Sequence, residues 1–159
     1  MNIRKFALPA GLASLLVAAL PVSAETIAFP AQTGQWLFAY ETVFRQSGPE
    51  LADAPQKHTR NLCIRPTDSA DYPKAMTKTL EQDGCSIEDY RSNGQTASFR
   101  AACPSVRFEA RYENLGKNQI RFTKTVRPEG EPVYFTESGI MSHHNDKTVR
   151  CGETDWLPF

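Results

Sequence analysis

The sequence predicts a mainly β protein, a curved antiparallel sheet or open up-and-down barrel of about 7–8 strands with one helix. Three observations lead to this prediction. Apolar and polar residues alternate along most of the chain, and short turn sequences such as Asn93-Gly94 separate the alternating runs. One stretch, residues 66–84, instead places its apolar residues at helical spacing.

Runs of alternating residues define the longer strands that we expect. They are residues 35–45, 57–64, 106–113 and 133–143, followed by a short last strand at 147–151. One face of the first strand carries Trp36, Phe38, Tyr40, Thr42 and Phe44. Because alternate side chains of a strand point to opposite faces, these aromatic rings share one side of the sheet. Gly139 lies inside the long strand at 133–143 and predicts a bulge or bend there.

The Asn93-Gly94 turn sets the pairing expected for the strands on either side of it. A three-residue loop centred on Gly94 places Cys85 opposite Cys103. A two-residue loop would turn these two cysteines to opposite faces of the sheet. The same register points Asp89 toward the core side, unless this residue lies at an open rim or a bulge rotates it outward.

Two further turns, one at Pro104-Ser105 and one at Leu115-Gly116-Lys117, set the pairing of the next strands. The pairs that they predict include Phe99–Ala110, Ala101–Phe108, Tyr112–Ile120 and Ala110–Phe122. Both registers keep apolar faces together, which a register wrong by one residue would not do. The exception is Lys124, which this register places opposite Phe108.

The helix is expected after Arg65-Pro66. Its apolar side chains are Tyr72, Met76 and Leu80, spaced four residues apart. Residues 67–71 offer several N-cap candidates, and Gly84 is a typical helix end. Because its apolar stripe is short, we expect this helix to lie over one mouth or edge of the sheet.

The first 24 residues have the pattern of a secretory signal peptide. A short basic segment is followed by an apolar run at residues 6–20 and then by the small residues Val22-Ser23-Ala24. A helix of this run reaches only about 22 Å, short of a bilayer core of about 30 Å. We therefore expect cleavage before Glu25, which leaves one domain at 25–159 with no membrane span, located in the periplasm or secreted.

Charge excludes one class of partner. The whole chain has 18 basic and 18 acidic residues. Removal of Arg4 and Lys5 with the signal peptide leaves 16 basic residues against 18 acidic ones, a net charge of −2. A slightly acidic domain of this kind is not a nucleic-acid-binding protein driven by net charge.

The four cysteines predict two disulfides. Their number is even, the chain is expected in an oxidising compartment, and no two of them have the close spacing of zinc ligands. The hairpin register favours Cys85–Cys103, and Cys63–Cys151 follows by elimination. Such bonds compensate for the thin core of a domain with about 135 residues.

The most plausible binding surface is the aromatic face of the sheet. A curved antiparallel sheet can hold one small ligand, which would here be apolar or lipid-like. The candidate ligand-binding residues are Trp36, Phe38, Tyr40, Phe99, Phe108, Tyr112 and Phe122. Lys124 and Asp89 would supply polar contacts near the rim. The same aromatic pattern is also typical of a filled core, and the two alternatives stay open at this point.

Other functions have weaker support in the sequence. His143 and His144 are weak candidates for metal ligands in a turn, and nothing indicates a cofactor or a set of catalytic residues, so the prediction is a non-enzymatic domain. The alternative to ligand binding is an interaction or inhibitor module that acts on an exported protein partner. It would use the loop at 47–56 or a sheet face that carries Arg100, Arg107, Arg111 and Arg121.

Several short motifs together resemble the domain-of-unknown-function 3617 family of small exported bacterial proteins. They are Thr33-Gly34-Gln35-Trp36, Cys63-Ile64-Arg65-Pro66, Cys85-Ser86-Ile87, Asn93-Gly94, Ser98-Phe99-Arg100, Cys103 and Cys151. The likeness covers about residues 33–152. Thr33 stands where the family has proline, and Arg65 where it has threonine. The resemblance implies an exported β domain with four cysteines, and it supplies no established activity or catalytic residue.

Overall fold

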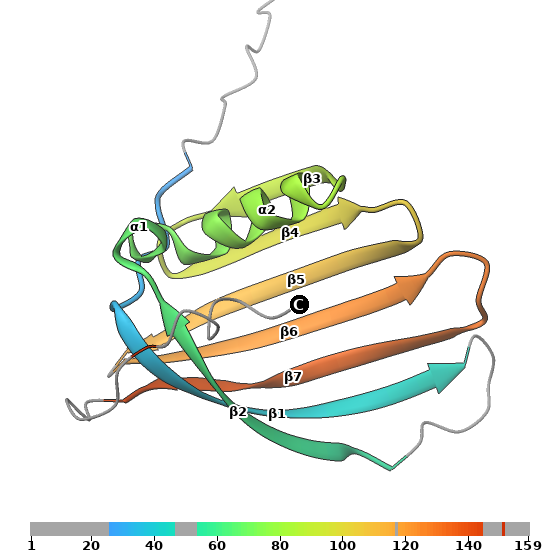
Figure 1. The fold of residues 1–159 in the computed structure, drawn as a ribbon, viewed down its shortest axis with the longest axis horizontal. Helices are drawn as coiled ribbons and strands as arrows, with labels where there is room; N and C mark the ends of the chain where they lie inside the picture. Colours follow the sequence, from blue (N-terminus) through green and yellow to red (C-terminus); the bar gives the residue numbers. More distant parts are fainter. Residues whose placement is uncertain (1–25, 47–53, 117, 145–150, 152–159) are drawn as a thin grey trace, which may run out of the picture.

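The chain folds into one open antiparallel sheet of seven strands (Figure 1), which confirms the predicted fold class. The computed structural model describes residues 26–46, 54–116, 118–144 and 151. The strands are β1 (Gly34–Gln46), β2 (Gln56–Ile64), β3 (Ser86–Ser92), β4 (Thr96–Ala102), β5 (Val106–Gly116), β6 (Gln119–Pro128) and β7 (Val133–His143). Their order across the sheet is β2-β1-β7-β6-β5-β4-β3. The expected signal peptide, most of the loop at 47–56 and the expected strand at 147–151, apart from Cys151, lie outside the described residues.

The predicted helix is present as α2 (Tyr72–Gln82), preceded by the single turn α1 (Pro66–Ser69). Asp71 is the N-cap of α2, and its side chain accepts a hydrogen bond from the backbone nitrogen of Lys74 at 3.4 Å. The helix ends at Gln82, and Gly84 follows two residues later with a φ of +84°, in the left-handed region that glycine adopts without strain. No helix in the described residues is long and apolar enough to cross a membrane.

The helices connect the two edge strands, β2 and β3, and α2 lies against the concave face over β3 and β4 (Figure 1). Their apolar side chains form the core together with the inner residues of the sheet. Phe29 belongs to this core and has no exposed surface. Its carbonyl oxygen accepts a hydrogen bond from the backbone nitrogen of Tyr72 at 3.0 Å, which holds the segment before β1 against α2.

Two of the predicted registers are confirmed. Ile87 pairs with Ala101, and the disulfide Cys85–Cys103 lies at the end of this hairpin. A bulge between Glu88 and Arg91 gives Asp89 a φ of +52° and rotates it out of the core side. The pairing of β4 with β5 is also as predicted, including Phe99–Ala110.

Both predicted disulfides are present. Cys85–Cys103 closes a loop with a sequence separation of 18, which is worth about 3 kcal/mol when the entropy of the unfolded chain is considered alone. Cys63–Cys151 has a separation of 88 and ties β2 to the end of the described chain. The protein therefore has one covalent link at the end of the β3–β4 hairpin and a second between two residues that are distant in the sequence.

The predicted pairing of β5 with β6 was wrong by two residues. Ala110 faces Lys124, and Tyr112 faces Phe122. The sequence had suggested a loop centred on Gly116, but Gly116 itself pairs with Gln119, and the register shifts between Asn114 and Gly116. A shift by two residues leaves every side chain on the same face, so the apolar pattern could not reveal the error. As a result Lys124 does not face Phe108.

Of the bulge or bend predicted at Gly139, the bulge is not present, because β7 stays in register with both neighbours through this residue. The glycine is needed for a different reason. A Cβ atom at this position would lie 2.1 Å from the carbonyl oxygen of Ala39 and 2.6 Å from the Cα atom of Tyr40. The close approach of β1 and β7 at this point therefore requires a residue without a side chain.

We expect Gly139→Ala to lower the free energy of unfolding by about 1–3 kcal/mol, because backbone atoms of β1 would have to move away. Urea unfolding followed by far-UV circular dichroism measures the change. Ser138→Ala is the control on the same strand, since Ser138 is exposed and its substitution should change stability by about 0.5 kcal/mol or less. Equal stabilities of the two variants would contradict the close approach.

Candidate functional site

The aromatic residues predicted to bind a ligand all lie in or against one core cluster on the concave face. Those that are buried are Trp36, Phe38, Phe99, Tyr112 and Phe122, while Tyr40 and Phe108 are half-buried. Helix α2 contributes Tyr72, whose ring meets the ring of Tyr112 edge-on at a centroid distance of 5.9 Å. This part of the concave face is therefore filled by the protein's own side chains.

Trp36 lies at one end of the filled region. Its Nε1 atom donates a hydrogen bond to the carbonyl oxygen of Gln32 at 3.0 Å, and its ring meets His143 edge-on at 5.4 Å. His143 Nε2 donates to the carbonyl oxygen of Thr33 at 3.0 Å, and His144 is exposed. Within the described residues, no group of three or more metal-ligating side chains is found. Through its contacts with Thr33 and Trp36, His143 holds the start of β1 against β7.

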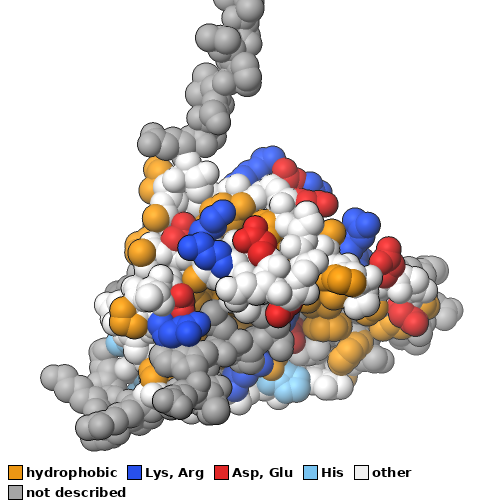
Figure 2. All heavy atoms as spheres, turned by 45° about the horizontal axis from the view of Figure 1, so that its top comes forward, with side chains coloured by type: hydrophobic (Ala, Val, Ile, Leu, Met, Phe, Trp, Pro, Cys, Tyr) orange, Lys and Arg blue, Asp and Glu red, His pale blue; other side chains and the backbone are white. Residues whose placement is uncertain are grey.

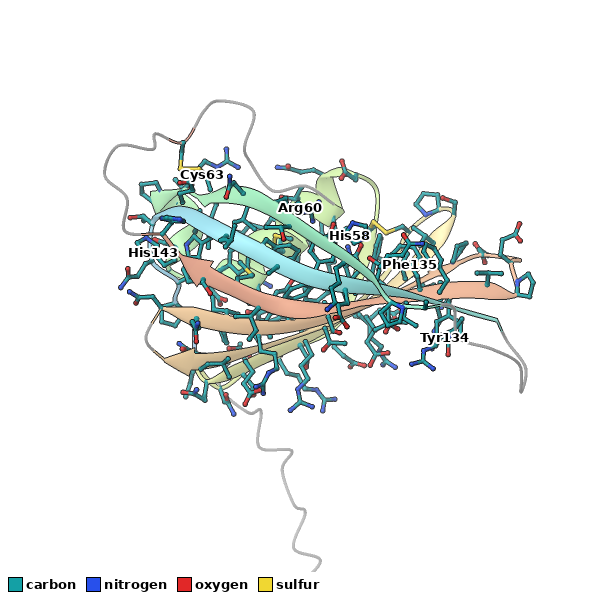
Figure 3. All side chains as sticks on the ribbon, turned by 90° about the horizontal axis from the view of Figure 1, so that it is seen from below. His58, Arg60, Cys63, Tyr134, Phe135 and His143 are labelled. Carbon is teal, nitrogen blue, oxygen red and sulfur yellow. A yellow bond between two sulfur atoms is a disulfide. The ribbon has the colours of Figure 1, made fainter. Side chains whose placement is uncertain are left out.

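A stack of rings continues from this region toward the β2 edge. Phe38 stacks on Phe122 at a centroid distance of 4.3 Å, and Tyr40 stacks on His58 at 5.0 Å. The guanidinium carbon of Arg60 lies 4.9 Å from the ring centroid of Phe38 and 5.3 Å from that of Tyr40. The β1–β2 register, which pairs Phe38 with Arg60 and Tyr40 with His58, brings these groups together. Arg60 and His58 therefore add a polar border to the aromatic face at β2 (Figure 3).

An ion pair crosses the concave face between β6 and β7. Lys124 Nζ lies 2.6 Å from Glu137 Oε2, and the two side chains are only 16% and 14% exposed. Lys124 and Glu137 are direct cross-strand partners, and the next residue of this row, on β1, is the buried Thr42. We call Thr42, Glu137 and Lys124 the polar row. A nearly buried ion pair does not by itself stabilise a fold, because both charges lose their hydration.

Beyond the polar row, toward the turns, the concave face is apolar again. The pairing of four neighbouring strands forms a second row that we call the apolar row, consisting of Phe44, Phe135, Val126 and Phe108. The rings of Phe44 and Phe135 are 5.7 Å apart. All members except Val126 keep part of their surface exposed. Hydrophobic side chains are visible at the surface in Figure 2, where they lie beside acidic groups.

The rim contacts differ from those expected. Lys124 lies on the concave face, but its partner is Glu137, a residue that the sequence analysis did not single out. Asp89 is turned away by its bulge and forms an ion pair with Arg100 on the opposite side. The sequence analysis also missed Phe135 and Arg60. The pairing of β1 with β7 brings Phe135 to the site, and the pairing of β1 with β2 brings Arg60 there. No short turn connects β1 to β7, so the sequence does not indicate that these two strands pair.

Three tyrosines of the core region carry shifted pKa values. Burial raises the pKa of Tyr72 and of Tyr112 above the usual range. Burial also raises the pKa of Tyr90, and the hydrogen bond from its hydroxyl to Asp71 Oδ1 at 2.7 Å adds to the effect. These phenols stay neutral at physiological pH and act as packing and hydrogen-bonding groups of the core region.

These features define a class, a small β domain with one curved sheet, a helix over β3 and β4 on the concave face, and two disulfides. The chain belongs to the family described as "Protein of unknown function (DUF3617)", whose model matches residues 31–150. No curated protein matches the sequence, and no solved structure matches the fold.

Removal of one member of the ion pair should cost more stability than removal of both. In Lys124→Met, Glu137 remains nearly buried without its cation, and we expect a loss of about 1–3 kcal/mol. The double variant Lys124→Met/Glu137→Met should be more stable than either single variant. Urea unfolding of the four proteins gives the coupling energy between the two residues. Strictly additive losses would show that the pair is not coupled.

The raised tyrosine pKa values predict alkaline instability. Above about pH 10 the unfolded chain releases phenolic protons that the folded chain retains, so stability falls as the pH rises. Below about pH 9 both states are protonated and this contribution to stability is complete. We expect a shallower decrease between pH 9 and about 11 for Tyr112→Phe than for the native chain. Urea unfolding at each pH measures it, and identical slopes would contradict the assignment.

Proposed function

We propose that this protein is exported and binds a small apolar or lipid-like molecule on its concave face, without catalysing a reaction. The single observation that carries the proposal is the apolar row. It extends the concave face beyond the region that α2 fills, and Phe44, Phe135 and Phe108 keep exposed apolar surface there. Burial of this surface by a ligand is favourable, at about 25 cal/mol for each Å² removed from water.

Polar groups near the apolar row support an amphiphilic ligand. The Lys124–Glu137 ion pair lies next to this row, and the guanidinium of Arg60 stands over the rings of Phe38 and Tyr40 further along the face. An apolar surface bordered by a few convergent polar groups is the usual composition of a small-molecule site. The apolar part of the ligand would lie on Phe44 and Phe135, with its polar end toward Lys124.

Export is the second part of the proposal. The signal-like pattern of residues 1–24 and the two disulfides both support it, since such bonds persist in oxidising compartments. The mature domain would then begin at Glu25, in the periplasm or outside the cell. N-terminal sequencing of the protein recovered from the periplasmic fraction tests this point, and a start at Met1 would contradict it.

Ligand binding is tested with the fluorescent fatty acid 11-dansylundecanoic acid. We expect saturable binding to the delipidated protein, weakened at least tenfold in Phe135→Ser, because this ring would contact the acyl chain. Ile140→Ser is the matched control, since Ile140 is an exposed residue of the same strand on the opposite face, and its affinity should stay within about twofold of the native value.

Native mass spectrometry of the protein as purified provides an independent measurement. A lipid that copurifies with the native protein and is lost in Phe135→Ser supports the proposal. Absence of copurifying lipid together with unsaturable dye binding would overturn it. The competing function, an interaction module for an exported protein, would then be favoured if crosslinking in envelope extract gave a reproducible partner.

A further inference from the structure

The disulfide Cys63–Cys151 fixes the point from which the rest of the chain continues. Its two Cα atoms are 5.8 Å apart, and it lies near the end of β2, an edge strand of the sheet. Cys63 is buried together with its neighbours Leu62 and Ile64. The residues that follow Cys151 lie outside the described part of the chain, and we call them the 152–159 segment. They are Gly152-Glu153-Thr154-Asp155-Trp156-Leu157-Pro158-Phe159.

The 152–159 segment combines two kinds of side chain. Glu153 and Asp155 are acidic, whereas Trp156, Leu157 and Phe159 are large and apolar. Apolar side chains are favoured where they leave water, and a carboxylate is favoured beside a cation. The complementary surface is therefore one that places a cation directly beside exposed aromatic rings.

The concave face of β2 has this composition. The guanidinium of Arg60 stands over the rings of Phe38 and Tyr40, and the ring of His58 stacks on that of Tyr40. Tyr40 keeps part of its surface exposed, and His58 is exposed. Figure 3 labels His58, Arg60 and Cys63, which follow one another along β2 in that order. An acidic and aromatic segment that starts at the disulfide thus meets a cation and exposed rings along the same strand.

The opposite, convex face of β2 does not have this composition. Its cation Lys57 is already paired with Glu41 on β1, with 3.8 Å between Nζ and Oε1. The next side chains of β2 on this face, Thr59 and Asn61, are exposed and polar. Of the two faces of β2, the concave one therefore suits the 152–159 segment.

The length of the chain also fits the concave face. Arg60 and His58 lie about 10 and 17 Å from the disulfide along β2, at about 3.3 Å per residue. Asp155 and Trp156 can extend at most about 14 and 18 Å from the disulfide, at no more than about 3.6 Å per residue. The carboxylate of Asp155 therefore reaches Arg60, and the indole of Trp156 reaches the rings beside it.

The apolar row is too far away for the same contact. Cys63 pairs with Gln35, and Phe44 lies about 30 Å further along β1 at about 3.3 Å per residue. Trp156 cannot span this distance from the disulfide. A ligand on the apolar row and the 152–159 segment would thus occupy different parts of the concave face.

We propose that the 152–159 segment folds back over the concave face beside β2. The carboxylate of Asp155 binds the guanidinium of Arg60, and the indole of Trp156 packs on Tyr40 and His58. The disulfide makes this an intramolecular contact with an effective concentration of about millimolar, so a weak interaction suffices to keep the segment in place. The segment then closes the β2 side of the concave face, whether or not a ligand binds the apolar row.

Backbone amide NMR spectra of the oxidised native protein and of a variant that ends at Cys151 locate the segment. We expect the shift differences to concentrate at residues 38–42 and 58–62, and the signals of β4, at the far side of the sheet, to stay unchanged. Differences centred on another part of the sheet, or no differences beyond Cys151 and its neighbours, would overturn the proposal.

The indole signal of Trp156 tests the chemistry of the contact. Its reference is a free synthetic peptide of residues 152–159. We expect Arg60→Gln and Asp155→Asn each to lower the docking constant about tenfold and to move the signal toward that of the peptide. Asp155→Asn keeps the test valid if Arg60→Gln disturbs the packing of β2, because residue 155 follows the disulfide and lies outside the core cluster.

Lys57→Gln is the matched control for Arg60→Gln. Lys57 is exposed on the same strand and the opposite face, so its substitution should change the docking constant by about twofold or less. An equal loss in Lys57→Gln, or a native Trp156 signal identical to that of the free peptide, would contradict the proposed contact.

Dilution separates the proposed contact from binding to a second copy of the chain. An intramolecular contact gives the same Trp156 signal from about 1 mM to about 50 µM protein, because its effective concentration does not depend on the total concentration. A signal that moves toward that of the free peptide on dilution would show that the segment binds a neighbouring copy, and it would overturn the proposal. No ligand is added in these measurements, so their outcome is separate from that of the dye-binding test.

Discussion

The pairing of β1 with β7 is the interaction on which the rest of the structure depends. It joins the β1–β2 hairpin, which comes first in the chain, to the meander from β3 to β7, and it runs from Trp36–His143 to Gln46–Val133 without a register shift. Only a glycine fits at position 139, where a Cβ atom would collide with the backbone of Ala39 and Tyr40. Because this pairing is unbroken, a single register aligns the side chains of β1 with those of β7 on both faces along its whole length.

The rows divide the concave face into parts with different physical roles. The aromatic residues nearest α2 are buried and supply the hydrophobic free energy of folding. The polar row brings the charges of Lys124 and Glu137 into an almost buried position, where a pair of apolar side chains would pack without any loss of hydration. The presence of this ion pair is therefore not explained by stability alone. It is explained if Lys124 and Glu137 fix the register of β6 against β7, or if they orient a ligand.

Local signals in the sequence are sufficient to predict the strand registers that short turns determine. The Asn93-Gly94 and Pro104-Ser105 turns each join neighbouring strands, so the registers of β3–β4 and β4–β5 and the Cys85–Cys103 bond follow from short-range geometry. The same reasoning gave the wrong register for β5 and β6, because a shift of two residues leaves each side chain on the same face and so preserves the apolar face. The alternation of residues thus predicts which face a side chain occupies more reliably than it predicts which partner that side chain meets.

The contacts within the candidate site could not be predicted either, because they depend on which strands pair and in which register. Phe135 reaches Phe44, and Arg60 reaches Phe38, through pairings that involve β1, and the β1–β7 contact spans most of the chain with no turn to define it. The sequence also could not distinguish a filled core from an open aromatic face, since both require the same alternation. In the structure Tyr112 packs against Tyr72 of α2, whereas Phe135 keeps part of its surface exposed.

Covalent geometry ties the two faces of the sheet to a single register. Phe108 and Arg107 are neighbours in the chain, as are Val126 and Arg127, and consecutive residues of a strand point to opposite faces. Each of these two apolar side chains of the concave face therefore shares its backbone with an exposed arginine of the convex face. A shift of β6 by one residue would exchange its two faces, and a shift by two would separate Val126 from Phe108 and Phe135. The register that assembles the apolar row thus also fixes which charges lie behind it.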